Sequence, residues 1–132
     1  MQALNGWAVL AAAIATFVLG GIWYAPAVFG RAWQRETGLT DEQLRDRKPA
    51  VIFGVSFLLS LLAAAVFALF LGPHPSLSLA VGAGFAAGLA WVAASLGINY
   101  LFEHKSLRLF LINGGYHTVQ FVVYGLVLGL FN

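Results

Sequence analysis

The stretch from Asn113 to Tyr124 reads NGGYHTVQFVVY and places polar groups inside an otherwise apolar run. Its polar members are Asn113, His117, Gln120 and Tyr124. Their spacing of i, i+4, i+7 and i+11 puts them within roughly 60° of one another on a helix. Polar side chains inside a membrane face protein, and small residues mark helix contacts. The stretch therefore predicts a membrane helix with a packing side and a lipid side.

Composition supports the same class of protein along the whole chain. Of its 132 residues 61% are hydrophobic and only 9% are charged, which excludes an ordinary soluble domain. All the charged residues lie in two segments, 31–48 and 103–108. The fold class is therefore all-α integral membrane, one domain over residues 1–132. Each uncharged run is near the roughly 20 residues that a bilayer requires, which predicts transmembrane helices at residues 4–24, 50–71, 77–100 and 109–131.

The distribution of charge also predicts an orientation. All seven Lys and Arg residues fall in the two loops at residues 29–48 and 101–108. The positive-inside rule then puts these loops in the cytoplasm and both termini in the periplasm. We therefore expect a multi-pass protein of the bacterial inner (cytoplasmic) membrane, with its four helices in two antiparallel hairpins.

Aromatic residues are expected to mark the membrane interface, because their rings favour headgroup depth. Phe29 and Trp33 lie four apart, which predicts a short interfacial helix in the first cytoplasmic loop. Thr40 and Gln43 form a capping box, so a second short helix should follow. The interface anchors predicted from the sequence are Trp23, Tyr24, Phe29 and Trp33.

Small residues recur at intervals of four, a spacing that lets two helices approach closely. In the third span Gly84, Gly88, Ser95 and Asn99 are expected on one face. Ser60 belongs to a similar repeat in the second span, where its hydroxyl could bond back to its own helix or across to another, back-bonding being the commoner use. The glycines expected to pack helices together are Gly20, Gly84, Gly88, Gly114, Gly125 and Gly129.

Three motifs carry a family resemblance. They are GIWYAPAVFGRAW (Gly21 to Trp33), NYLFEHKS (Asn99 to Ser106) and LINGGYH (Leu111 to His117), followed by Gly125. In this order the chain resembles the domain-of-unknown-function 1761 family of small four-span bacterial membrane proteins, over nearly its whole length. The resemblance implies a membrane protein and brings no catalytic assignment with it.

One candidate site is the polar stripe together with its neighbours. His117 lies inside the fourth span, where an ionisable side chain is a functional hypothesis. A neutral His117 could hold helices in register by bonding to Asn99, Ser95, Gln120 or a tyrosine. It could instead serve as a proton or ligand site. The residues of this candidate intramembrane site are Asn99, Asn113, Tyr116, His117, Gln120 and Tyr124.

The chain lacks the residues that several kinds of chemistry require. Cysteine is absent, which removes disulfides, thiolate metal sites and iron–sulfur clusters. Only His117 lies within a predicted span, so a bis-histidine haem would need a second chain, and zinc lacks ligands. Walker, Rossmann and hydrolase motifs are missing, and a net charge of +2 does not favour nucleic acid. We therefore expect no enzyme, no metal, no cofactor and no nucleic-acid partner.

Two functions remain. The first is a packing or assembly subunit that lies in the lipid bilayer. It forms a homo-oligomer or docks on a larger membrane complex through small-residue faces. The alternative is a carrier or ligand-binding membrane protein, with an unidentified small molecule held at the polar site around His117.

Overall fold

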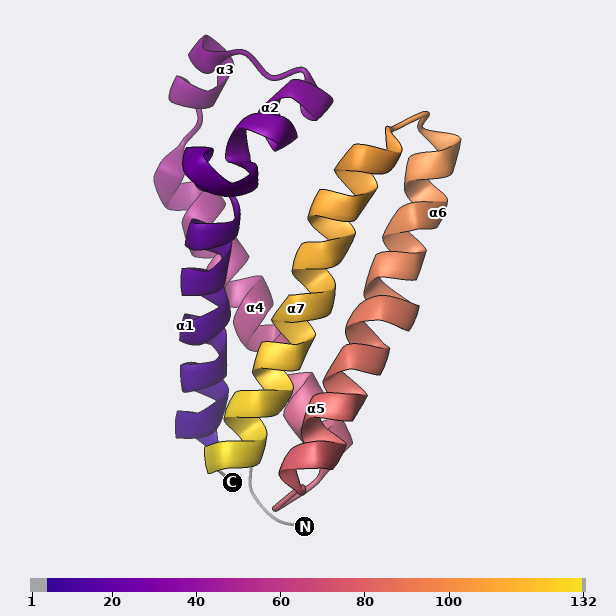
Figure 1. The fold of residues 1–132 in the computed structure, drawn as a ribbon. Coiled ribbons are helices and arrows are strands. Elements are labelled where there is room, and N and C mark those ends of the chain that lie inside the picture. The colour runs from indigo at the N-terminus through magenta and orange to yellow at the C-terminus, as the bar shows by residue number, and fades with distance from the viewer. Residues whose placement is uncertain (1–4, 132) are drawn as a thin grey trace.

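The computed structural model describes residues 5–131, and these fold entirely into helices and their connections (Figure 1). Four helices are long and apolar enough to cross a membrane. This confirms the prediction of an all-helical chain with four such segments. The elements are α1 (Gly6–Trp23), η1 (Pro26–Gly30), α2 (Arg31–Thr37), α3 (Asp41–Arg45), α4 (Pro49–Leu71), α5 (Leu77–Ala86), η2 (Ala87–Ala93), α6 (Ala94–Phe102) and α7 (Leu107–Phe131).

The third long helix runs without a break from Leu77 to Phe102 as α5, η2 and α6. It ends two residues beyond the predicted position 100, and α7 begins before the predicted position 109. The connection is short because Ser106 caps α7, with its Oγ accepting from the Leu109 amide at 3.0 Å. Arg108, expected in a loop, therefore lies in the first turn of α7.

The end of α1 leads into a compact connection. Pro26 starts the π-helix η1, and the Gly30 amide bonds to the Ala25 carbonyl at 2.9 Å. A Cβ on Gly30 would overlap the carbonyl oxygen of Tyr24, so this turn requires glycine. In the interfacial segment Phe29 belongs to η1 and Trp33 to α2, which follows η1 without a gap, so the segment begins as a π-helical turn.

Farther along this connection, α2 stops at Gly38, which has a φ of 75°. The capping box at α3 forms as predicted. Thr40 Oγ1 accepts from the Gln43 amide at 3.1 Å, and the Gln43 side chain accepts from the Thr40 amide at 2.9 Å. Both bonds satisfy amides that the first turn of a helix leaves without partners.

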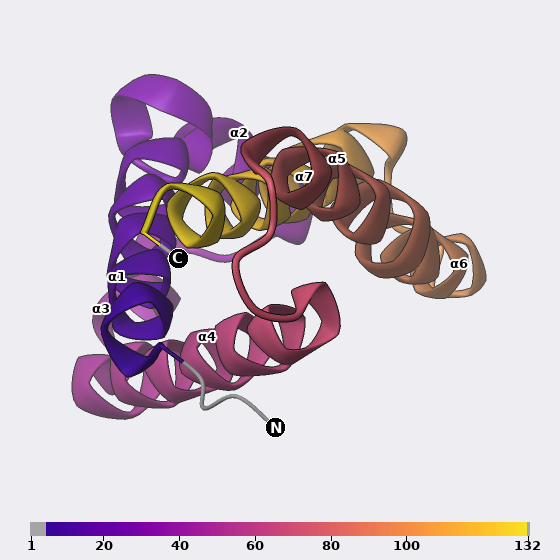
Figure 2. The same ribbon diagram turned by 90° about the horizontal axis from the view of Figure 1, so that it is seen from below.

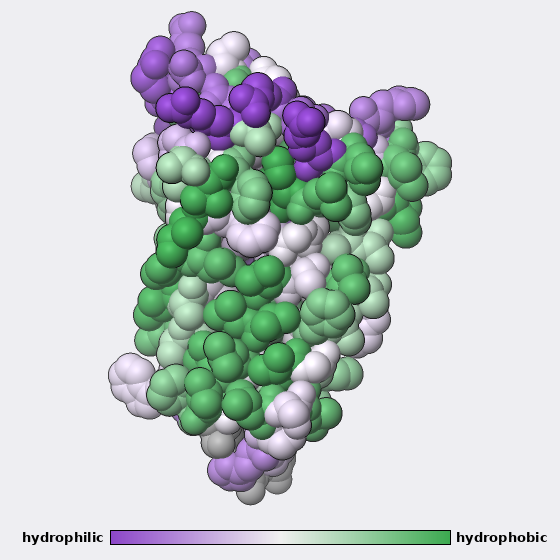
Figure 3. All heavy atoms as spheres, viewed as in Figure 1, coloured by the Kyte–Doolittle hydropathy of each residue, from purple (hydrophilic) through white to green (hydrophobic). Residues whose placement is uncertain are grey.

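Helix α7 is the centre of the arrangement. It packs along α1 on one side and along α5 and η2 on the other, whereas α4 packs mainly against α1 (Figures 1 and 2). The face of the molecule shown in Figure 3 is covered by hydrophobic side chains between its two ends, and hydrophilic residues gather at the end that carries α2 and α3. A belt of hydrophobic side chains between the two ends is the pattern that a membrane-spanning bundle requires.

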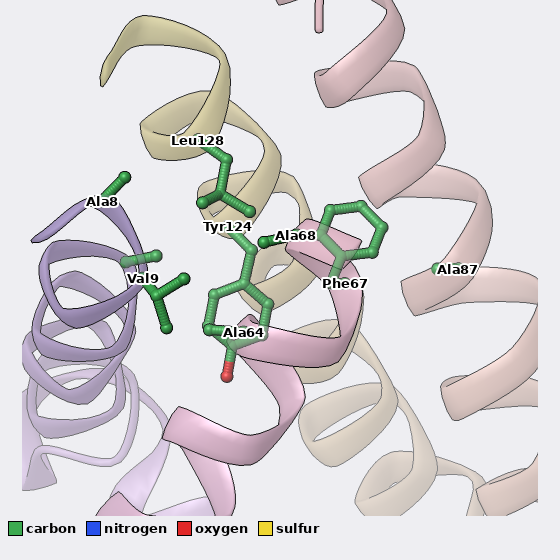
Figure 4. Close-up of a cluster of buried hydrophobic side chains, with 9 residues drawn as sticks. Ala8, Val9, Ala64, Phe67, Ala68, Ala87, Tyr124 and Leu128 are labelled. Carbon is green, nitrogen blue, oxygen red and sulfur yellow. The ribbon is translucent and has the colours of Figure 1, made fainter. Parts of the chain in front are cut away.

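The hydrophobic core lies at the opposite end from α2 and α3. Tyr124 and Leu128 of α7 are fully buried between α1 and α4 (Figure 4). Alanines make up much of the facing surfaces, which lets these helices approach closely. The cluster consists of Ala8, Val9, Ala12, Ala64, Phe67, Ala68, Ala87, Tyr124 and Leu128.

Candidate functional site

The third long helix and α7 approach each other through glycine. A Cβ on Gly84 would overlap the Phe121 carbonyl, and one on Gly88 would lie 2.7 Å from the His117 carbonyl oxygen. A Cβ on Gly125 would overlap the carbonyl oxygen of Ala80. These three glycines therefore place backbone directly against backbone, the closest contact that two helices make.

The other glycines expected at helix contacts meet side chains. A Cβ on Gly20 would lie 3.2 Å from the Tyr116 hydroxyl, and one on Gly129 would lie 3.0 Å from a methyl of Leu77. A Cβ on Gly114 would lie 3.4 Å from the Cβ of Ala93 in η2 and 3.3 Å from the Phe110 ring of its own helix. All six glycines thus pack within the chain.

A chain of hydrogen bonds runs from His117 through three helices. His117 Nδ1 and Gln120 Oε1 are 2.7 Å apart, and Gln120 Nε2 donates to the Tyr124 hydroxyl at 2.8 Å. That hydroxyl lies 2.7 Å from Ser60 Oγ on α4, which lies 3.1 Å from Thr16 Oγ1 on α1. These five side chains, named here the polar chain, fasten α7 to both α4 and α1.

Two hydrogen bonds made by the polar chain have a defined donor. Thr16 gives its proton to the Ala13 carbonyl at 3.1 Å, and the Gln120 amide nitrogen gives a proton to Tyr124. The amide oxygen of Gln120 therefore accepts, and Nδ1 of His117 donates to it. An amide in the middle of the polar chain does not pass protons as a hydroxyl does. The arrangement is suited to holding helices together.

A second polar cluster lies nearer the charged end. Asn113 accepts from the Tyr24 hydroxyl at 2.6 Å and donates to the Tyr100 hydroxyl at 2.7 Å. One amide thus joins α1, α6 and α7. The Trp23 indole donates to the Ile112 carbonyl at 2.9 Å.

Tyr116 connects the two clusters. Its hydroxyl donates to the Thr16 carbonyl at 3.1 Å, and its ring packs against Tyr24 and His117 with centroids 5.5 Å and 5.3 Å away. The predicted anchors lie beside this aromatic group. Phe29 packs on Trp23 at 4.9 Å, and Trp33 meets Tyr24 at 6.0 Å.

The prediction that Ser95 or Asn99 of the third span meets the polar stripe of α7 is wrong. Ser95 and Asn99 are exposed, and the residue of this span that meets the stripe is Tyr100. The reason is the π-helix η2, which uses more residues per turn than an α-helix. Positions after it are rotated relative to an α-helical extrapolation from Gly84 and Gly88.

Sequence reasoning favoured a bond from Ser60 back to its own helix over a bond across, placed Thr16 only in a small-residue repeat, and gave Tyr100 no role. Ser60 bonds across to Tyr124 and not back to its own helix. The signal available for Ser60 and Thr16 was a hydroxyl within a small-residue repeat, a hydroxyl that can reach a neighbouring helix as well as its own backbone. Among residues 5–131 no three His, Asp or Glu side chains gather as a metal site requires.

The fold and the site define an all-helical protein whose four long apolar helices are joined by glycine contacts and internal hydrogen bonds. A family model described as protein of unknown function (DUF1761) matches residues 7–129, and the chain belongs to this family. No curated protein and no solved structure matches the chain.

Proposed function

We propose that this protein is a small, non-enzymatic assembly subunit of the bacterial inner membrane, which associates through an outer face of its third long helix. The observation that supports this is a ladder of small residues at intervals of four, all exposed: Ser78, Gly82, Ala86, Ala90 and Ala94. A Cβ added to Gly82 meets nothing within 4 Å. Such ladders bring the backbones of membrane helices into contact.

The outer ladder differs from the inner glycines of the same helix. Gly84 and Gly88 already contact α7, so they are not available to a second molecule. By contrast, α4 exposes large side chains such as Leu58, Leu62 and Val66, which suit lipid. The ladder is therefore the face that best fits another helix, in a homo-oligomer or a larger complex.

The alternative function, a carrier or a ligand-binding protein with its site at His117, has less support. Of the side chains expected to line that site, His117, Gln120 and Tyr124 bond to one another along the polar chain, and Asn113 is bonded to Tyr24 and Tyr100. These hydrogen bonds hold the helices together and occupy polar groups that would otherwise recognise a ligand.

Cysteine cross-linking tests the assembly proposal, since the natural chain has no cysteine. Gly82→Cys and Ala86→Cys are expected to form disulfide-linked dimers, or adducts with another protein, when membranes are oxidised. Leu62→Cys, also exposed but on α4, is the matched control and should remain monomeric. Equal cross-linking at all three positions, or none at Gly82 and Ala86, would contradict the proposal.

We also propose that α1 pairs with α4, and the third long helix with α7, as two hairpins with both termini in the periplasm. The contacts of α1 with α4 and of the third long helix with α7 support the pairing. The charge asymmetry supports the orientation, because all seven Lys and Arg residues lie in the segments that contain α2 and α3 and the start of α7. In this placement Phe29 and Trp33 lie at the cytoplasmic interface.

Reporter fusions test this orientation. Alkaline phosphatase joined after Asn132 is expected to be active, because it folds only in the periplasm, and a fluorescent reporter there should stay dark. Insertion of the phosphatase between α2 and α3 should be inactive. The opposite pattern would reverse the topology.

A further inference from the structure

A cavity that is open to the outside of the bundle lies between the end of α1, the turn η1 with α2, and the start of α7. Its volume is about 430 Å³, within the range of small-molecule pockets. The rings of Trp23 and Phe29 line one side, and Leu111 and Ile112 of α7 line the other. The cavity is separate from the polar chain.

Hydrocarbon makes up nearly all of the lining. Even Trp23 presents only its ring, because its indole N–H is bonded to the Ile112 carbonyl. The one charged residue in the lining is Arg108, which is exposed. An occupant that matches these walls has a hydrocarbon tail and one anionic group beside a guanidinium, which pairs well with phosphate.

The cavity is held open by its own packing. Trp23 is fixed by its hydrogen bond and by the Phe29 ring, whose centroid is 4.9 Å away. Gly115 of α7 makes room for the indole, since a Cβ there would lie 3.2 Å from the Trp23 ring. A site built before its ligand arrives loses less conformational freedom on binding.

We propose that this cavity binds one acyl chain of an anionic phospholipid, with the phosphate of the headgroup against Arg108. The site lies at the end of the bundle that carries the charged segments, where headgroups are expected, and basic pockets between membrane helices recognise anionic headgroups. The inference uses the membrane placement but not the assembly role, so either can fail alone.

Fluorescence quenching by brominated lipids tests the site. The full chain with Trp7→Phe, Trp33→Phe and Trp91→Phe retains Trp23 as its one tryptophan. In vesicles, brominated phosphatidylglycerol is expected to quench Trp23 at about fivefold lower mole fraction than brominated phosphatidylcholine with the same acyl chains. That ratio corresponds to about 1 kcal/mol for one basic residue near a headgroup.

Two variants in this background separate the site from general surface charge. Arg108→Gln is expected to reduce the fivefold ratio to about one. Lys105→Gln removes the same charge from an exposed position outside the cavity and should leave the ratio unchanged. A ratio of one in the parent, a ratio that survives Arg108→Gln, or an equal loss in both variants would overturn the proposal.

A third variant tests the place of the acyl chain. Ala32→Leu fills part of the cavity and is expected to weaken quenching by both lipids while the helical content stays constant. Unchanged quenching would mean that the acyl chain lies elsewhere. Quenching that falls as the protein-to-lipid ratio rises would mean that a second copy occupies the cavity, which also overturns the proposal.

Discussion

Replacing Tyr124 with alanine is expected to lower the free energy of unfolding by about 3–5 kcal/mol, the usual cost of truncating a buried aromatic side chain. Tyr124 has no exposed surface and packs within the cluster that joins α1, α4 and α7. Its loss also leaves Gln120 and Ser60 without their shared partner. The measurement is reversible unfolding in mixed micelles, followed by circular dichroism.

Tyr124→Phe is the matched control, because it keeps the ring and removes only the hydroxyl. Polar contacts between membrane helices average about 0.6 kcal/mol and reach about 1.7 kcal/mol. The phenylalanine variant should therefore be much less destabilised than the alanine variant. Equal losses would contradict the view that ring packing dominates at this position.

Gly125→Leu is expected to produce the other large loss of stability. A side chain here would enter the space occupied by the Ala80 carbonyl, so α5 and α7 would have to separate. Overpacking of this kind costs about 1–3 kcal/mol when side chains can adjust, and here the obstacle is backbone. The same unfolding measurement applies.

Gly54→Leu provides the control for Gly125. A Cβ at Gly54 meets nothing within 4 Å, and leucine is a better helix former than glycine by roughly 1 kcal/mol. This variant should therefore be neutral or slightly more stable. If both leucine variants behaved alike, the close contact between α5 and α7 would not be the cause.

The sequence was sufficient to predict the four apolar helices and the inward direction of the stripe on α7. The length of each uncharged run predicts the four helices, and helical periodicity predicts the direction of the stripe. Neither signal says which helix lies opposite. The partners of the stripe are Tyr24, Ser60 and Tyr100, and their identity depends on how helices distant in sequence pack together.

The prediction that Asn99 faces the stripe failed for a more local reason. The third span was extrapolated with a single α-helical period, whereas η2 inserts a wider turn midway. Its sequence AGLAWVA contains no proline to mark the change. Residues before η2 kept the predicted orientation, with Gly84 buried, and residues after it did not, with Ser95 exposed.

The central position of α7 has a consequence for synthesis. A ribosome makes α1, α4 and the third long helix before α7, yet α7 supplies Tyr124 and the glycine surface that join them. Until it emerges, the hydroxyls of Thr16 and Ser60 lack the tyrosine that completes their network. Elements made early in a chain often fold as they appear. Here α1 and α4 contact each other directly and can pair before α7 is made, whereas the third long helix makes its main contacts with α7 and is expected to dock only when α7 arrives.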